Sequence, residues 1–194
     1  MAALIDEMRY ARLAMPSEEG IGKEVSGMAA DECRSRAPKS VRFSVITVSD
    51  TKRGKEDLSG MIISRILIRA GHKEVQRSIV RSDVSEIQKA LRESVEDAGT
   101  QAVIITGGTG VGRKDVTLEA VSHFEEKQLP GFGELFRFLS NQEIGSAAMM
   151  SRATAFVSEG KVVFCLPGSE DAVKLATEKL IAPELGHIVF AANR

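Results

Sequence analysis

Three glycines and two threonines follow an apolar stretch near the middle of the chain. The segment reads Thr106-Gly-Gly-Thr-Gly110, and residues 102–106 before it are typical of a strand buried in a parallel sheet. Glycines let the backbone approach a ligand closely, and amides exposed in such a turn can bind an anion. The segment therefore predicts a phosphate-binding loop, with a ligand-free glycine turn as the alternative. It is neither a P-loop nor a GxGxxG fingerprint, because no Gly-Lys-Ser/Thr follows and the spacing differs.

Charged residues come directly after this loop. Arg113 and Lys114 can neutralise phosphate, and the carboxylate of Asp115 can hold a hard cation. A cation held between a carboxylate and phosphates is the usual arrangement for phosphoryl or nucleotidyl transfer. The alternative is that Asp115 caps the N-terminus of the next helix.

Two other strand ends carry residues that could contact a ligand. Ser49 and Asp50 follow the strand predicted over 41–48, and Leu166-Pro-Gly-Ser169 follows the strand predicted over 162–166. Gly168 and Ser169 predict either a second anion-binding helix start or an ordinary turn.

Asp83 lies just after the strand predicted over 75–80. It is either the N-cap of the helix predicted over 84–97 or a second acid that faces Asp115. The residues alone leave both interpretations open. The three histidines, His72, His123 and His187, have no metal-ligand spacing, so surface or core roles are expected for them.

Alternating strands and helices must position these residues. Apolar runs predict strands over 41–48, 75–80, 102–106, 154–157 and 162–166. Helical spacing predicts helices over 58–70, 84–97, 117–124, 133–141, 169–181 and 183–190. Strands separated by helices predict an α/β fold with a doubly wound, mostly parallel sheet in three layers. Ligands of such folds bind at the carboxyl ends of the strands.

Composition limits the organisation and the partners. The chain has 194 residues, 43% of them hydrophobic, and a net charge of −1, which fits one α/β domain and lacks the basic field of non-specific nucleic-acid binding. No apolar run is long enough to cross a bilayer. Residues 1–40 predict an N-terminal extension or oligomerisation arm, with a short amphipathic helix at Met1 to Met15, and residues 41–194 predict the domain. Two scattered cysteines, Cys33 and Cys165, indicate reduced thiols and a cytoplasmic protein.

Read in order, the motifs resemble a known family. The series is Val48-Ser-Asp50, Thr106-Gly-Gly-Thr-Gly110, Arg113-Lys-Asp-Val-Thr117, Pro130-Gly-Phe-Gly-Glu134, Ser151-Arg-Ala153 and Leu166-Pro-Gly-Ser169. It is similar to the MoaB/Mog family of molybdenum cofactor biosynthesis, which has the molybdopterin-binding fold. The resemblance spans about residues 41–190.

The resemblance implies a molybdopterin adenylyltransferase that uses ATP and Mg2+ and releases pyrophosphate. It implies Asp115 and Asp83 as the catalytic acids and metal ligands, with Asp50 a less favoured second acid. Together with the residue patterns described above, it assigns substrate and nucleotide binding to Ser49, Asp50, Thr106, Gly107, Gly108, Thr109, Gly110, Arg113, Lys114, Ser151, Arg152, Pro167, Gly168 and Ser169.

One departure from the family pattern favours an alternative function. The family usually has two acids in the segment that here reads Arg81-Ser-Asp83, so one carboxylate is replaced by Ser82. A molybdopterin-binding carrier, scaffold or regulator without turnover is the alternative. A nucleotide-binding structural oligomer whose 1–40 arm recruits partners is a more remote one.

The family also implies a homo-oligomer, either a trimer or a hexamer, and other molybdenum cofactor biosynthesis proteins as further partners. Leu135, Phe136 and Phe138 are crowded on one predicted helix. They predict either a subunit contact or core packing.

Overall fold

The computed structural model describes residues 34–51 and 54–194, and Arg36–Arg194 form one compact unit. The helix predicted at Met1 to Met15, Cys33 and nearly all of the predicted 1–40 extension lie outside the described residues. Among the helices that the structure describes, none is long and apolar enough to span a membrane.

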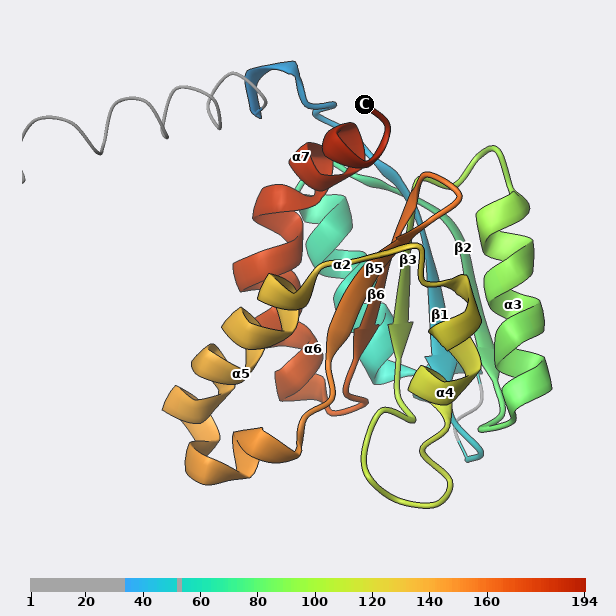
Figure 1. Ribbon diagram of the computed structural model, residues 1–194, viewed down its shortest axis with the longest axis vertical. Coiled ribbons are helices and arrows are strands. Elements are labelled where there is room, and N and C mark those ends of the chain that lie inside the picture. The colour runs from blue at the N-terminus through green and yellow to red at the C-terminus, as the bar shows by residue number, and fades with distance from the viewer. Residues whose placement is uncertain (1–33, 52–53) are drawn as a thin grey trace, which may run out of the picture. The chain divides into compact units, whose positions relative to one another are not determined.

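A mostly parallel sheet forms the centre of this unit (Figure 1). Its strands are β1 (Arg42–Val48), β2 (Lys73–Val80), β3 (Ala102–Thr106), β4 (Lys127–Gln128), β5 (Thr154–Ser158) and β6 (Lys161–Leu166). Their order is β2-β1-β3-β6-β5-β4, with β1, β2, β3 and β6 parallel and β4 and β5 antiparallel to their neighbours. The predicted doubly wound, mostly parallel sheet is confirmed.

Helices cover both faces of the sheet (Figure 1). They are α2 (Leu58–Arg69), α3 (Val84–Glu96), α4 (Thr117–Val121), α5 (Pro130–Ile144), α6 (Glu170–Ala176) and α7 (Ala182–Ala192). Shorter turns are η1 (Gly54–Glu56), η2 (Ser122–Phe124), η3 (Gly145–Met150) and the π-helical η4 (Thr177–Ile181). The helices α2, α5, α6 and α7 pack on one face, and α3 and α4 pack on the other.

Alternation along the strands builds these two cores. On β3, Ala102 and Ile104 point to the face covered by α2 and α5, whereas Val103 and Ile105 point to the face covered by α3 and α4. All five residues of β3 are buried because helices cover both sides. The three predicted layers follow from this arrangement.

Cys165 belongs to the core of the α3 side. It lies on β6 and is fully buried, and burial raises the pKa of its thiol. His72 is also buried, and its Nδ1 accepts a 3.2 Å hydrogen bond from the backbone N–H of Val41.

The structure differs from the sequence-based elements in several places. The helix predicted over 117–124 ends at Val121 and continues as η2, and the helix predicted over 169–181 ends at Ala176 and continues as the π-helical η4. The helix predicted over 133–141 begins at Pro130 and extends to Ile144 as α5. The 3₁₀ segment η3 follows it, and the two-residue strand β4 pairs with β5. Neither η3 nor β4 was predicted, since each depends on packing rather than on local periodicity.

Candidate functional site

The carboxyl ends of three neighbouring strands bring the predicted loops together. Thr106 pairs in register with Thr47 of β1 and with Leu166 of β6. Two bonds then join the loops after β3 and β6, one from the Gly107 N–H to the Leu166 carbonyl at 3.0 Å and one from Thr106 Oγ1 to the Pro167 carbonyl at 2.9 Å. Thr106 and Gly107 thus act behind the site rather than in its lining.

The glycine loop has a backbone that only glycine adopts readily. Gly107 and Gly108 have φ values of +95° and +63°. A Cβ atom at Gly107 would lie 2.3 Å from the Val48 carbonyl oxygen, and one at Gly108 would lie 2.5 Å from Thr117 Oγ1. The close approach and the dihedrals together explain the two glycines. The need for glycine at these two positions is therefore explained without a bound ligand.

Asp115 folds back onto the loop instead of capping α4. Its Oδ2 accepts a 2.9 Å hydrogen bond from the Gly112 N–H, whereas the N-cap position of α4 is Val116, without a side-chain bond. The first residue of α4, Thr117, is buried and donates through Oγ1 to the Gly107 carbonyl at 2.7 Å. The capping alternative for Asp115 is therefore not what the structure shows.

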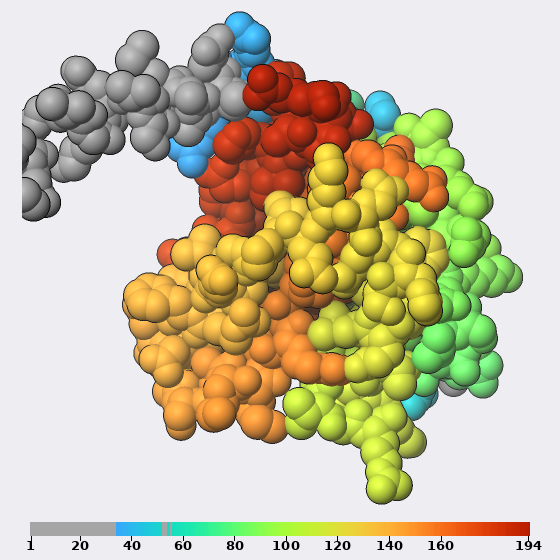
Figure 2. All heavy atoms as spheres, viewed as in Figure 1, coloured from blue at the N-terminus to red at the C-terminus, as the bar shows by residue number. Residues whose placement is uncertain are grey.

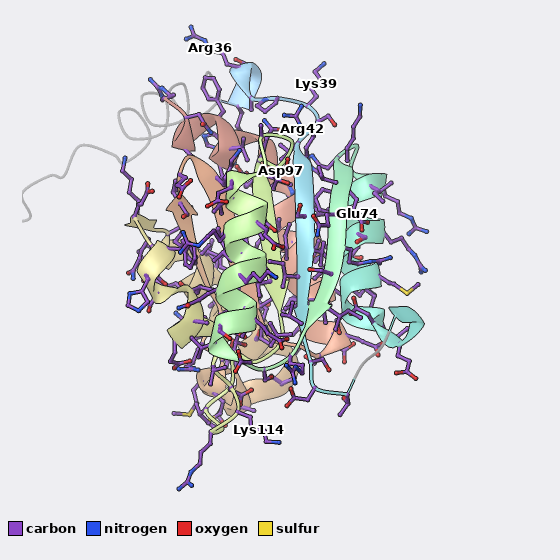
Figure 3. All side chains as sticks on the ribbon, turned by 90° about the vertical axis from the view of Figure 1, so that its right-hand side faces the viewer. Arg36, Lys39, Arg42, Glu74, Asp97 and Lys114 are labelled. Atoms are coloured by element: carbon purple, nitrogen blue, oxygen red, sulfur yellow. The ribbon has the colours of Figure 1, made fainter. Side chains whose placement is uncertain are left out.

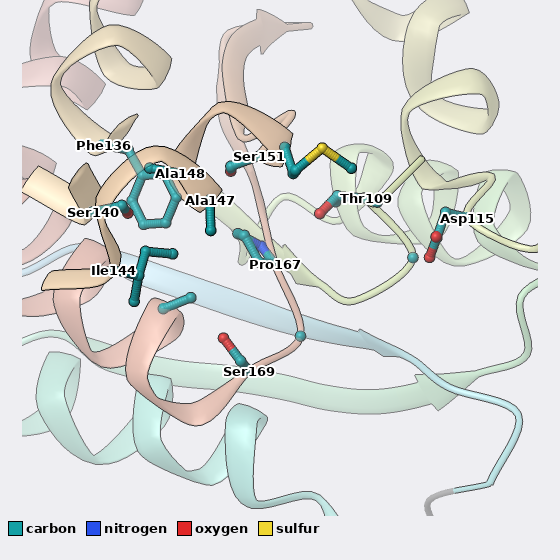
Figure 4. A pocket seen from close by; sticks show the side chains of 15 residues that line it. Thr109, Asp115, Phe136, Ser140, Ile144, Ala147, Ala148, Ser151, Pro167 and Ser169 are labelled. Carbon is teal, nitrogen blue, oxygen red and sulfur yellow. The ribbon is translucent and has the colours of Figure 1, made fainter. Parts of the chain in front are cut away.

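A pocket of about 320 Å³ lies where these loops meet α5 and η3 (Figure 4). Its polar side contains eight residues that the sequence assigned to the site, namely Gly108, Thr109, Gly110, Asp115, Ser151, Pro167, Gly168 and Ser169. Ser169 occupies the N-cap position of α6, and its side chain makes no capping bond. Its hydroxyl therefore does not cap α6.

The opposite wall of the pocket is largely apolar and was missed by the sequence analysis. Its residues come from α5, η3 and α6 and are Phe136, Ser140, Ile144, Ala147, Ala148, Met150 and Ala172. Figure 4 shows Phe136 and Ile144 facing the polar side across the cavity. Positions 136, 140 and 144 follow the four-residue spacing of one helix face, which was the available signal. The cavity thus has an apolar side opposite a side lined by the glycine loop, Asp115 and two serines.

The predicted second acid lies outside this lining. Asp83 is the N-cap of α3, and its Oδ1 accepts hydrogen bonds from the backbone N–H groups of Ser85 and Glu86 at 3.0 and 3.1 Å. These bonds and the Ser85 hydroxyl lower the pKa of Asp83. Asp50 accepts a 3.0 Å bond from the Ser82 N–H, which brings Asp50 next to that segment. The structure thus shows the capping alternative for Asp83.

Ser49 and Asp50 follow β1 at the same edge of the sheet. The Ser49 N–H donates to the Val80 carbonyl at 2.8 Å, so both residues border β2 rather than the pocket. The bond from the Ser82 N–H places Asp50 beside the loop after β2.

The three predicted cations differ in their surroundings. Arg113 and Lys114 are exposed on the loop tip, which projects from the molecule beside α5 and η3 (Figure 2), and Lys114 points outward in Figure 3. Arg152 instead donates to the Thr109 carbonyl at 3.0 Å and to Glu119 Oε1 at 2.6 Å. Neither Arg152 nor its partner Glu119 lines the pocket.

The donors present fit a magnesium ion only in combination with phosphate oxygens. Among the described residues, no group of three or more His, Cys, Asp or Glu side chains could hold a metal ion. Mg2+ is commonly bound by one or two carboxylates together with substrate phosphates and water. Asp115 offers such a carboxylate at the rim of a loop whose glycines leave room for phosphate.

These features define a doubly wound α/β protein whose candidate ligand site joins a glycine loop, an acid and an apolar wall at the carboxyl edge of the sheet. A family model described as "Probable molybdopterin binding domain" matches residues 44–187. The chain belongs to the MoaB/Mog family of molybdenum cofactor biosynthesis proteins, and it has the molybdopterin-binding fold.

Relatives and solved structures support the same assignment along most of the chain. Molybdenum cofactor biosynthesis protein B of Bacillus subtilis is 47% identical over 163 residues, covering 84% of this chain and 96% of the relative. The Bacillus cereus protein of the same name is 45% identical over 168 residues, covering 86% and 99%. The crystal structure of the tungsten cofactor synthesizing protein MoaB from Pyrococcus furiosus has a TM-score of 0.74 at 40% identity, covering 81% of this chain and all of that one.

Proposed function

We propose that the protein is an Mg2+- and ATP-dependent molybdopterin adenylyltransferase, which forms adenylyl-molybdopterin and pyrophosphate. The observation that supports this most directly is the pocket in which the loop of Gly108–Gly110 and Asp115 faces the apolar wall of Phe136 and Ile144. The loop suits phosphate, and the wall suits a pterin ring system.

The reaction needs alignment more than proton transfer. An oxygen of the molybdopterin phosphate attacks the α-phosphorus of ATP and forms a new P–O bond. The bond from that phosphorus to the oxygen bridging to the β-phosphorus breaks, and pyrophosphate leaves. Because a phosphate is already an adequate nucleophile, the protein contributes mainly positioning and charge neutralisation.

Each part of the site has a role in this scheme. The amides of residues 108–110 bind phosphate oxygens, and Arg113 and Lys114 reduce the remaining negative charge. Asp115 would hold Mg2+, which neutralises triphosphate charge when bound. Ser151 and Ser169 offer hydroxyl groups to the pterin or to its phosphate, and both line the pocket. Asp83 stays a proposed second ligand through its Oδ2 oxygen.

The carrier function is the second candidate, and one observation favours it. Position 82 is a serine, and the neighbouring Asp83 directs its Oδ1 oxygen to helix capping. A site with one weakly placed second acid would bind molybdopterin without transferring AMP to it.

Pyrophosphate release from ATP with purified molybdopterin and Mg2+ tests the proposal. The native chain should release pyrophosphate, and Asp115→Asn, which keeps the shape and removes the charge, should lower the rate by about 10²-fold. Glu93→Gln is the matched control, since it removes an exposed carboxylate on α3 and should leave the rate unchanged.

Two results would contradict parts of the proposal, the first the role of Asp115 and the second the adenylyltransferase activity itself. A near-native rate in Asp115→Asn would show that Asp115 is not the essential acid. Tight molybdopterin binding by the native chain in titration calorimetry, with ATP present and no pyrophosphate released, would favour the carrier.

A homo-oligomer belongs to the same proposal. Phe136 is buried in the core, whereas Leu135 and Phe138 are 55% and 63% exposed on α5. Met149 on η3 is also exposed, whereas the exposed Ile144 and Met150 line the pocket. Exposed apolar surface of this kind is typical of subunit contacts. The family resemblance implies a trimer or hexamer, which sedimentation should show, and a stable monomer at micromolar concentration would contradict it.

A further inference from the structure

Arg152 holds the loop after β3 at two points. It lies between η3 and β5, and it reaches across to the loop. Its Nε donates to the Thr109 carbonyl at 3.0 Å, and its Nη2 donates to the Asp115 carbonyl at 3.3 Å. Both carbonyls belong to pocket-lining residues, and they flank the exposed tip at residues 111–114. One guanidinium therefore ties together the two ends of the tip.

Glu119 fixes the orientation of that guanidinium. Its carboxylate, on α4, accepts hydrogen bonds from Nη1 at 2.6 Å and from Nη2 at 3.3 Å. This is the two-pronged geometry that a planar guanidinium forms with a carboxylate. The hydrogen bond from Arg152 is the main cause that lowers the pKa of Glu119. The pair is only partly buried, with side-chain exposures of 33% and 53%.

These contacts leave Arg152 little capacity to bind a substrate directly. A guanidinium has five N–H groups. One is directed at Thr109, one at Asp115 and two at Glu119. The contacts of Arg152 are thus mainly to the protein itself, in contrast to the exposed Arg113 and Lys114 of the tip.

The same contacts restrain Asp115 from two sides. The Gly112 N–H holds the side chain of Asp115 at 2.9 Å, and Arg152 holds its backbone carbonyl. We infer that Arg152 and Glu119 form a positioning pair that sets the glycine loop and the Asp115 carboxylate in the arrangement needed for the reaction. This inference rests on the proposed function for its kinetic consequence, but its structural part can be measured without substrate.

The structural part is tested by amide hydrogen exchange of a peptide spanning residues 107–118, measured by mass spectrometry on the full chain. Arg152→Gln and Glu119→Gln should each increase exchange in this peptide by about tenfold or more, with exchange of the β5 and β6 peptides unchanged. Arg152→Lys is the decisive variant. It keeps the positive charge, but one ammonium group cannot reach both carbonyls and both carboxylate oxygens. It should therefore behave like Arg152→Gln. Glu93→Gln is the control for loss of an exposed carboxylate and should match the native chain.

The kinetic part uses the adenylylation assay with the same variants. A misplacement of about 1 Å in a reacting group can cost 10²-fold, so kcat should fall 10- to 100-fold in Arg152→Lys and Arg152→Gln. KM for ATP should change much less, because the exposed cations and loop amides remain. The thermal midpoint of unfolding should stay within a few degrees, which separates positioning from general stability.

Native exchange in Arg152→Lys would overturn the inference, since charge alone would then be sufficient. Increased exchange with unchanged kcat would also overturn it, because the pair would then be structural only. If the native chain itself releases no pyrophosphate, the proposed function fails. The inference is then decided by the exchange data together with calorimetric binding of molybdopterin, which Arg152→Lys should weaken.

Discussion

Gly107 shows how the absence of one side chain shapes the loop. Its positive φ and the nearby Val48 carbonyl leave no room for a Cβ atom, so the chain can pass close to the end of β1. Gly131 is different, because a Cβ atom there would meet nothing within 4 Å and its φ is not in the left-handed region. The two glycines therefore differ in what a side chain at each position would meet.

We predict opposite outcomes for alanine at these two positions. Gly107→Ala should lower the free energy of unfolding by more than the ~1–2 kcal/mol of a left-handed alanine, because the contact with Val48 adds to it. Gly131→Ala, in the first turn of α5, should raise the free energy of unfolding by about 0.4–1 kcal/mol. Urea denaturation of both variants measures their free energies of unfolding. Equal changes in the two variants would contradict the difference between Gly107 and Gly131.

The sequence alone could not decide whether Asp83 and Asp115 cap helices or face a ligand. Asp83 and Asp115 each follow a polar segment and precede a helix, so both could cap a helix or face a ligand. The structure separates them because the amides after Asp83 donate to its carboxylate, whereas the carboxylate of Asp115 accepts from the amide of Gly112, three residues earlier. The path of the loop decides which backbone N–H can donate to each carboxylate. The local sequence does not determine that path.

At the scale of elements, periodicity predicted the long strands and helices among residues 34–51 and 54–194 to within a few residues, apart from the break of the helix predicted over 169–181 into α6 and the π-helical η4. The elements that it missed are short and depend on partners, such as β4, whose two residues pair with Val157 and Phe156 of β5. The apolar wall was missed for a related reason. Its residues belong to α5, η3 and α6, and only the packing of the chain places them opposite the glycine loop.

The turn between β5 and β6 gives a prediction at this scale. Glu159 is the one residue other than glycine with a positive φ in the described part of the chain, at 48°, and Gly160 follows it at 73°. Asparagine adopts this conformation more readily and favours such two-residue turns when glycine follows.

Glu159→Asn should therefore raise the free energy of unfolding by about 0.5–1 kcal/mol, a fraction of the cost of the left-handed region for an ordinary residue. Glu159→Gln keeps the backbone penalty and should stay at the native value. Thermal unfolding of the two variants measures the difference. If both variants were more stable than the native chain, the cause would be the removal of the charge of Glu159 and not the relief of its positive φ.

For the whole molecule, a buried histidine couples stability to pH. Burial lowers the pKa of His72, and the neutral ring accepts the Val41 N–H at the start of β1. The unfolded chain then binds the proton more readily than the folded chain does. The contribution of His72 is fully present above its unfolded pKa of about 6.5 and is lost as pH falls towards the folded pKa.

We therefore expect the native chain to lose stability between pH 7.5 and 5.5. In His72→Asn this loss should be smaller, because the amide oxygen can accept the same N–H but does not titrate. His187→Asn is the control, since His187 is less buried and pairs with Glu184. The urea midpoints of unfolding at the two pH values measure the effect. If His72→Asn showed the same pH dependence as the native chain, another titrating group would be responsible for the loss of stability.

Cys165 offers a chemical reporter for the centre of the sheet. Its thiol lies on β6 between covered faces, so an alkylating reagent reaches it only when β6 separates from its surroundings. In a Cys33→Ser variant, the rate at which this thiol is alkylated measures how often β6 separates from the strands and helices around it. The same alkylation rate, measured with a ligand in the pocket next to the end of β6, would show whether ligand binding slows the separation of β6.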